Sequence, residues 1–253
     1  MIADPLFYAL AIPAVILLGL AKGGFAGAGA VAMPLLALVI SPVRAAAILL
    51  PILIVQDLVG VWAFRRTWDK GILRVALPGA TLGIFLGYLL ATKVSATTIM
   101  GVLGAISILF GLYRLRLSAK PDMAAPKPRS AADDTALGWA FSAASGFTSQ
   151  IAHAGQPPFQ MWVLPKNLAT ASFVGTNAIY FAAINWIKVP AYAALGQFTA
   201  DNLLTAAALL PVAIVSTFAG VWLVRRVDGG RFYTIMYLLM IVVGAGLLWE
   251  ALR

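Results

Sequence analysis

Hydrophobic positions run through this chain in long uninterrupted blocks, which charged residues separate. A helix that crosses a membrane needs about 20 apolar residues, within a range of about 17 to 25. Six blocks reach that length, at 45–64, 75–91, 97–113, 168–187, 203–224 and 232–252. Four are shorter, at 6–20, 28–40, 137–152 and 159–164, and they form one adjacent pair at the start of each half. The pattern predicts an all-α integral membrane protein in which each half holds a broken or re-entrant helix pair and three transmembrane helices.

Composition agrees with lipid as the surrounding solvent. Of 253 residues, 62% are apolar and 11% are charged, and the mean hydropathy is +0.93. A soluble domain is nearer half apolar and a quarter charged, and a water-facing surface this apolar would carry large sticky patches. The N-terminus has Asp4 and no basic segment before its first apolar block, which argues against a cleaved signal peptide.

One long polar segment, 118–135, contains three prolines and mixed charges, and reads as a disordered linker. It divides the chain into a first membrane repeat at 1–117 and a second at 136–253. A shift of 133 residues places Pro78 on Pro211 and Gly111 on Gly244. This shared spacing indicates an internal duplication.

The distribution of lysine and arginine predicts the orientation, because cytoplasmic loops are enriched in both. With the linker in the cytoplasm, thirteen of these residues fall inside and Lys22 is buried in the membrane. Four fall outside: Arg44, Lys93, Lys188 and Arg253. An odd number of crossings in each half makes the two repeats inverted, a plan that recurs in secondary transporters.

A polar, glycine-containing break interrupts each short pair, at 19–29 and at 146–158. The helix that follows a break directs its N-terminal N–H groups into the gap, so two such ends would form an anion cradle. Lys22 lies in the first break and His153 in the second, with Gln150 and Gln156 beside it. Lysine within a membrane is costly and indicates function, although an interfacial lysine that extends to water would fit the same pattern.

Other polar residues lie inside the long blocks. Asp57 is a candidate proton carrier, as is His153, or else a structural partner for Lys22 or Arg44. Thr176 and Asn177 offer a hydroxyl and an amide that suit oxyanion recognition, and hydrogen bonding between helices explains them equally well.

Several function classes are disfavoured. With no cysteine and one histidine, a metal site is not expected, and no cofactor is indicated. The net charge of +9 fits basic cytoplasmic loops better than nucleic-acid binding. The glycines at 23–27 do not form a Walker A motif, and the sequence has no Gly-x-Ser-x-Gly or His-Glu-x-x-His motif of an enzyme.

Two segments resemble the TauE/SafE sulfite exporter family of organic-anion permeases: 19–34 (GLAKGGFAGAGAVAMP) and 171–199 (ASFVGTNAIYFAAINWIKVPAYAALGQFT). The resemblance implies transport of a small sulfur-containing or organic anion in the bacterial cytoplasmic (inner) membrane. It carries site roles onto Lys22, Gly23, Gly24, Gly27, Gly29, Gly175, Thr176, Asn177 and Asn185. Members often have a glycine run where this chain has His153 to Pro158, which leaves the particular anion open.

The sequence therefore predicts a secondary transporter, not an enzyme, that moves sulfite, sulfoacetate or a related sulfonate by alternating access of its two halves. The expected substrate-binding residues are Lys22, Gly23, Gly24, Gly27, His153, Gln156, Thr176 and Asn177, and the expected proton-coupling residues are Asp57 and His153. Its expected partners are the bilayer and a small anion, with homo-oligomer formation left open. An anion channel and a membrane receptor without flux are the alternatives.

Overall fold

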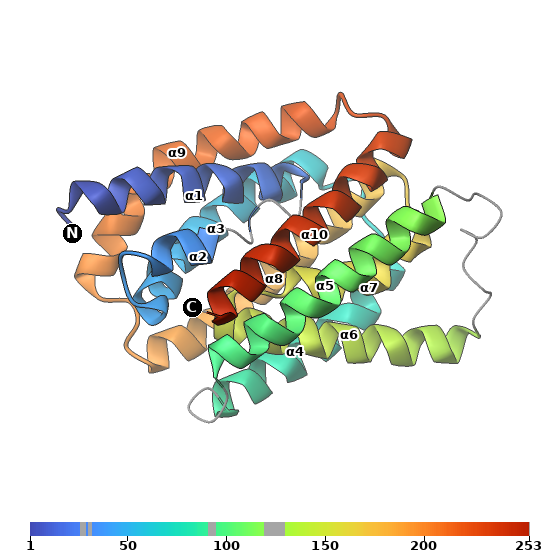
Figure 1. Cartoon of the computed structure of the whole chain (residues 1–253), viewed down its shortest axis with the longest axis horizontal. Helices are drawn as coiled ribbons and strands as arrows, with labels where there is room; N and C mark the ends of the chain where they lie inside the picture. Colours follow the sequence, from blue (N-terminus) through green and yellow to red (C-terminus); the bar gives the residue numbers. More distant parts are fainter. Residues whose placement is uncertain (26–28, 30–31, 91–94, 119–129, 253) are drawn as a thin grey trace.

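The computed structural model describes residues 1–25, 29, 32–90, 95–118 and 130–252. Within these residues the chain is helical and contains no strand (Figure 1), which confirms the all-α class. The helices are α1 (Pro5–Gly23), α2 (Ala32–Ala37), α3 (Pro42–Phe64), α4 (Lys70–Leu90), α5 (Ala96–Ser118), α6 (Ala131–Ala152), α7 (Gln156–Val163), the 3₁₀ turn η3 (Leu164–Lys166), α8 (Thr170–Ala194), α9 (Ala200–Val224) and α10 (Gly229–Leu252).

The two halves share one order of elements, a long helix, a short helix and three long helices. They are interlocked rather than side by side. Helix α1 packs along α9, α6 along α4, α3 against α8, and α5 against α10 (Figure 1). Exchanging α1–α5 for α6–α10 converts each of these pairs into another pair or into itself. The arrangement agrees with the duplication expected from the spacing of proline and glycine.

The first helix of each short pair is longer than expected. Helix α1 has 19 residues and α6 has 22, so only α2 and α7 are short. The expectation of four short helices was wrong, because α1 and α6 continue through the polar residues that mark the ends of their apolar blocks. Asp4 caps α1 by accepting from the Leu6 amide, and the helix runs through Lys22 to Gly23.

Helix α6 also takes up part of the expected linker. Ser130 caps it by accepting from the Asp133 amide at 3.1 Å, and acidic residues in the first turn favour a helix N-terminus. The end of the segment 118–135 is therefore helical. Residues 119–129 lie outside the described part of the chain.

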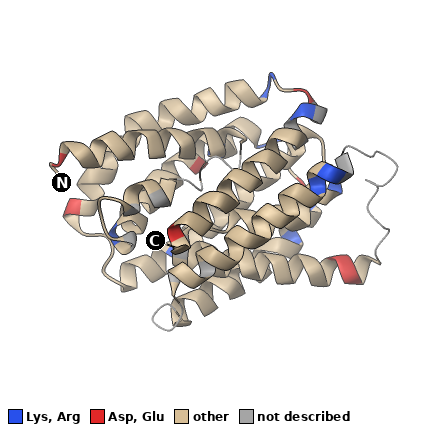
Figure 2. Ribbon diagram, viewed as in Figure 1, with Lys and Arg blue, Asp and Glu red and all other residues tan. Residues whose placement is uncertain are grey.

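The outer surface is suited to lipid. Five described helices are long and apolar enough to cross a membrane: α1, α4, α9, and most of α3 and α10. Large apolar side chains face outward, among them Leu109, Val215 and Trp249, which are 67%, 69% and 69% exposed. Charged segments lie mainly towards helix ends, whereas most of each helix carries none (Figure 2). In water such a surface would aggregate, and in a bilayer it is solvated.

Two of the basic connections lie side by side, and one lysine that was expected in a loop is inside a helix. Arg225 of the α9–α10 connection donates to the Ala63 carbonyl at 3.3 Å, so this connection lies beside the α3–α4 connection. At the N-terminal ends of α3 and α9, Arg44 Nε donates to Asn202 Oδ1 at 3.3 Å. Lys188 does not belong to an exposed loop. It is fully buried in α8, which continues to Ala194.

Glycines bring the paired helices into close contact. A Cβ on Gly23 would lie 2.5 Å from Gly220 Cα, where α1 crosses α9. A Cβ on Gly83 would overlap the Ala143 carbonyl, where α4 crosses α6. Close approach of small residues is the usual means by which helices associate in lipid, where no hydrophobic effect drives them together.

Two glycines of α10 provide a matched test of this packing. A Cβ on Gly244 would lie 2.6 Å from the Gly104 carbonyl oxygen of α5, whereas a Cβ on Gly246 meets nothing within 4 Å. We expect Gly244→Leu to lower the free energy of unfolding by about 1–3 kcal/mol through overpacking. Gly246→Leu should match the wild type. Thermal unfolding in detergent measures both, and equal midpoints for the two variants would contradict close α5–α10 packing.

Candidate functional site

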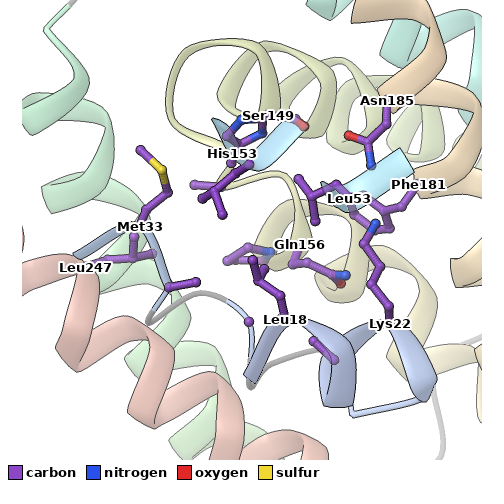
Figure 3. A pocket seen from close by; sticks show the side chains of 16 residues that line it. Leu18, Lys22, Met33, Leu53, Ser149, His153, Gln156, Phe181, Asn185 and Leu247 are labelled. Atoms are coloured by element: carbon purple, nitrogen blue, oxygen red, sulfur yellow. The ribbon is translucent and has the colours of Figure 1, made fainter. Parts of the chain in front are cut away.

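A cavity of about 60 Å³ lies where the two breaks meet. Both halves build it, because α1, α2, α3, α6, α7, α8 and α10 all contribute residues to its wall. Figure 3 shows polar side chains around it together with apolar ones. The polar residues are Lys22, Ser149, His153, Gln156 and Asn185, and the apolar ones include Leu18, Met33, Leu53, Phe181 and Leu247. The volume is several times the roughly 10–15 Å³ that one ordered water needs.

Lys22 forms a buried ion pair on one side of this cavity. Its Nζ lies 2.6 Å from Asp57 Oδ1, with the two side chains 7% and 1% exposed. Asn185 Nδ2 donates to the other carboxylate oxygen of Asp57 at 2.6 Å. The Lys22 ammonium also lies 5.3 Å from the centre of the Phe181 ring. Of the two roles foreseen for Asp57, partner of Lys22 and proton carrier, the structure shows the pairing.

Asp57 and Asn185 hold equivalent places in the two halves. Asp57 is fifteen residues after Pro42, the first residue of α3, and Asn185 is fifteen after Thr170, the first residue of α8. Their hydrogen bond therefore lies where the two equivalent helices cross. The ion pair is thus anchored at the centre of the molecule by one residue from each half.

His153 belongs to a second polar cluster on α6 and α8. Lys188 Nζ lies 3.0 Å from His153 Nδ1 and 3.1 Å from Ser149 Oγ. His153 Nε2 lies 3.3 Å from the Ala46 carbonyl and 3.3 Å from the Tyr192 hydroxyl. An ammonium that donates to Nδ1 requires the neutral imidazole with its proton on Nε2, and that proton is then available to the Ala46 carbonyl.

The local sequence explains how the second break is tolerated. His153 ends α6 in the left-handed conformation (φ 52°), and its amide bonds back to the Ser149 carbonyl at 3.2 Å. Ser145 Oγ donates to the Gly155 carbonyl at 2.6 Å, and Thr148 Oγ1 donates to the Ala154 carbonyl at 3.0 Å. Side-chain hydroxyls of α6 therefore satisfy carbonyls that a continuing helix would have satisfied.

Both breaks begin later than expected. The first starts at Gly24, the C-cap of α1 (φ 146°), and the second comprises His153 to Gly155. The anion cradle of N–H groups is also poorer than expected. Helix α7 opens with Gln156, Pro157 and Pro158, and neither proline has an N–H group to offer an anion. At the α7 side of the cavity the side chain of Gln156 is therefore the better donor, while the first residues of α2, Ala32 and Met33, lie in the opposite part of the wall.

The expected substrate-binding residues fall into four groups, the last of which is Thr176 and Asn177. Lys22, His153 and Gln156 line the cavity, and Gly29 does so as well. Gly23 and Gly24 instead allow close packing on α9, against Gly220 and Val224. Gly27 lies outside the described residues.

Thr176 and Asn177 are not in the cavity wall. The Thr176 hydroxyl accepts from the Asp69 amide at 2.8 Å, and a Cβ on Gly175 would overlap the Thr67 carbonyl. The Gly-Thr pair therefore fits α8 against the α3–α4 connection. Asn177 is buried, and its Oδ1 has no hydrogen-bond partner within the described residues.

Sequence reasoning missed Lys188, Ser149 and Tyr192. Lys188 was placed outside because it follows the apolar block 168–187, and only the continuation of α8 to Ala194 shows that it is inside. The signal available was its place between Ile187 and Val189, with no second charge nearby in α8. Ser149 lies four residues before His153 and so shares its face of α6.

Comparison with known families decides the class of protein. The model of the sulfite exporter TauE/SafE family matches residues 11–247. The chain belongs to the TauE/SafE family. No match was found among curated proteins or among solved structures. The matched region includes both breaks and every residue of the cavity wall. As a member of the TauE/SafE family, the chain is a multi-pass membrane transporter.

The ion pair of this TauE/SafE protein can be tested by its stability. Asp57→Asn leaves the Lys22 ammonium buried without a counter-charge, and we expect a loss of about 3–5 kcal/mol in unfolding free energy. The double variant Lys22→Met with Asp57→Leu should recover most of it, because neither charge remains. Thermal unfolding in detergent measures both.

Asp201→Asn is the control for this test, because Asp201 forms an ion pair with the Met1 amino group while 67% exposed. An exposed pair contributes little, so its unfolding midpoint should hardly change. If Asp57→Asn is no less stable than Asp201→Asn, the buried pair does not stabilise the fold.

Proposed function

We propose that this chain is a secondary transporter that carries a small sulfur-containing or organic anion, such as sulfite, sulfoacetate or a related sulfonate, across the bacterial inner membrane by alternating access. The observation that carries the proposal is the cavity at the meeting point of the two breaks. It is walled by both halves and holds Lys22, Ser149, His153, Gln156 and Asn185.

The chemistry of the cavity wall suits an oxyanion. Gln156 accepts from Gln160 through its Oε1 at 3.1 Å, so its own Nε2 protons remain for a ligand. Ser149, His153 and Asn185 offer hydroxyl, imidazole and amide groups, and Lys22 provides a cation within a low-dielectric wall. The apolar residues around them exclude bulk water, which strengthens each of these interactions.

Inverted topology supports alternating access. The C-terminal end of α3 and the C-terminal end of α9 meet through Arg225 and Ala63, and α4 begins at that same connection. Helix α4 therefore runs away from this connection, whereas its equivalent α9 runs towards it. Opposite directions in equivalent helices are what an in-plane pseudo-twofold axis produces, and transporters built this way bind substrate near the midplane.

Proton coupling through Asp57 or His153 forms part of the proposal. Asp57 is buried beside the cavity, and His153 is partly buried in its wall. Each is hydrogen-bonded to a residue of the opposite half, Asn185 for Asp57 and Ala46 for His153. A rearrangement of the halves would break these bonds and change the surroundings of both groups. An anion channel is the rival, and it would need no such coupling.

Flux into liposomes tests the transport proposal. We expect saturable uptake of labelled sulfite or sulfoacetate by the purified protein, accelerated by a proton gradient. Lys22→Ala should reduce it by about tenfold or more, because Asp57 would then oppose an anion without its partner. Lys166→Ala is the control, since Lys166 pairs with Asp134 away from the cavity. Single-channel currents would favour a channel, and unchanged flux in Lys22→Ala would place the site elsewhere.

Sided labelling tests the topology, and the absence of cysteine from the chain makes single replacements clean. Arg66→Cys and Asp228→Cys lie in the two adjoining basic connections, so a membrane-impermeant maleimide should reach both from the cytoplasmic face. Leu195→Cys, at the C-cap of α8, should be reached from the opposite face. Labelling of all three from one face would contradict the inverted arrangement.

A further inference from the structure

Three ionisable side chains, Lys22, Asp57 and Lys188, are buried around the cavity. Lys22 and Asp57 form an ion pair at 2.6 Å. Lys188 is fully buried, yet no carboxylate oxygen of a described residue lies within 4.0 Å of its Nζ. Its partners are neutral acceptors, namely His153 Nδ1 at 3.0 Å and the Oγ and carbonyl oxygen of Ser149 at 3.1 and 3.4 Å. With both lysines and Asp57 ionised and His153 neutral, the set carries one net positive charge.

An isolated buried ammonium is costly, and native proteins offset such a cost with a counter-charge. Lys22 and Asp57 both lie within electrostatic range of Lys188, but their opposite charges are paired with each other at 2.6 Å. Asp57 is further held by Asn185 at 2.6 Å, which keeps its carboxylate turned to the Lys22 side. The charge of Lys188 is therefore left for a ligand to neutralise.

Lys188 stands one side chain behind the cavity wall. Ser149 and His153 both line the cavity, and both accept hydrogen bonds from the Lys188 ammonium. Because Ser149 Oγ accepts from the ammonium, its own proton is left to donate, and no described group accepts it. A hydroxyl polarised in this way is a strong donor to an anion. Lys188 thus acts on a ligand through Ser149 as well as through its field.

We propose that Lys188 provides the single net charge of the site, and that the cavity consequently selects monoanions, such as hydrogen sulfite or a simple alkanesulfonate, over dianions. The inference rests on the proposed function, since it concerns the ligand of the same cavity. It narrows that proposal to hydrogen sulfite and monosulfonates, because sulfoacetate carries two negative charges at neutral pH. A second negative charge would have no counter-charge there, and the apolar residues Leu18, Met33, Leu53 and Leu247 cannot hydrate it.

Binding to the purified full-length protein tests this charge count with three ligands of constant charge. Methanesulfonate is a monoanion, methanedisulfonate a dianion, and dimethyl sulfone a neutral molecule of nearly the shape of methanesulfonate. Propanesulfonate, a monoanion of larger size, controls for the bulk of the disulfonate. We expect the wild type to bind methanesulfonate about tenfold or more tightly than either the sulfone or the disulfonate.

Two variants move the charge in opposite directions. Lys188→Met removes the net charge, so the preference for methanesulfonate over dimethyl sulfone should vanish, and Lys188→Arg should restore it. Asp57→Asn raises the net charge by one, so the binding preference should shift towards methanedisulfonate. Added methanedisulfonate should then also raise the unfolding midpoint of the Asp57→Asn variant. If Lys188→Met does not fold, the Asp57→Asn and Lys188→Arg variants still decide the question.

Flux measured with the same ligands separates this inference from the transport proposal. Equal binding of monoanion and neutral sulfone by the wild type overturns the role of Lys188, as does transport of monoanion and dianion at equal rates. Charge-selective binding without any flux supports the charge count and overturns transport.

Discussion

A backbone that stops being helical inside a bilayer leaves N–H and C=O groups that no water can satisfy, and this constraint organises the molecule. The second break meets it with hydroxyls of α6: Ser145 donates to the Gly155 carbonyl and Thr148 to the Ala154 carbonyl. The first ends α1 at Gly24, in a conformation that glycine adopts without strain. At each break, this arrangement fixes the residue at which the helix ends. The residues around the two helix ends form part of the cavity wall.

Charge placement follows from the same geometry. Lys22 is two residues before the C-cap of α1 and His153 is the C-cap of α6, so helix termination carries both to the cavity. Asp57 and Lys188 come from α3 and α8, the helices that cross at the centre. A cationic group is brought in from each half, while the single carboxylate pairs with only one of them. The asymmetry between the halves is therefore electrostatic, although their helices correspond.

Sequence patterns predicted the membrane class and the approximate position of both breaks, because a polar residue within an apolar block is costly wherever the block is buried. Lys22, His153 and Gln156, which the same patterns singled out, line the cavity. The sequence patterns placed residues wrongly where a helix continues beyond the end of its apolar block. Lys188 follows such a block and was assigned to a loop, and only the turn of α8 beyond Ile187 carries it inward. Thr176 lies outside the cavity wall for a different reason. A hydroxyl on a buried face serves packing as readily as binding, and its partner Asp69 is 107 residues away in the sequence.

Interlocking of the halves bears on how access could alternate. One apolar core joins α1, α2 and α3 to α9, so residues such as Val15 and Ile48 of the first half pack with Leu209 of the second. Another joins α4 to α7 and α8, with Ile84 packed among Phe159 and Phe173. Each core thus mixes helices of both repeats, and neither repeat can move as a rigid body without breaking both. Under the proposed alternating access, the moving units would therefore be mixed bundles rather than the sequence halves. The crossing of α3 and α8 at Asp57 and Asn185 is one contact between them, and α9, which contributes to both cores, is another.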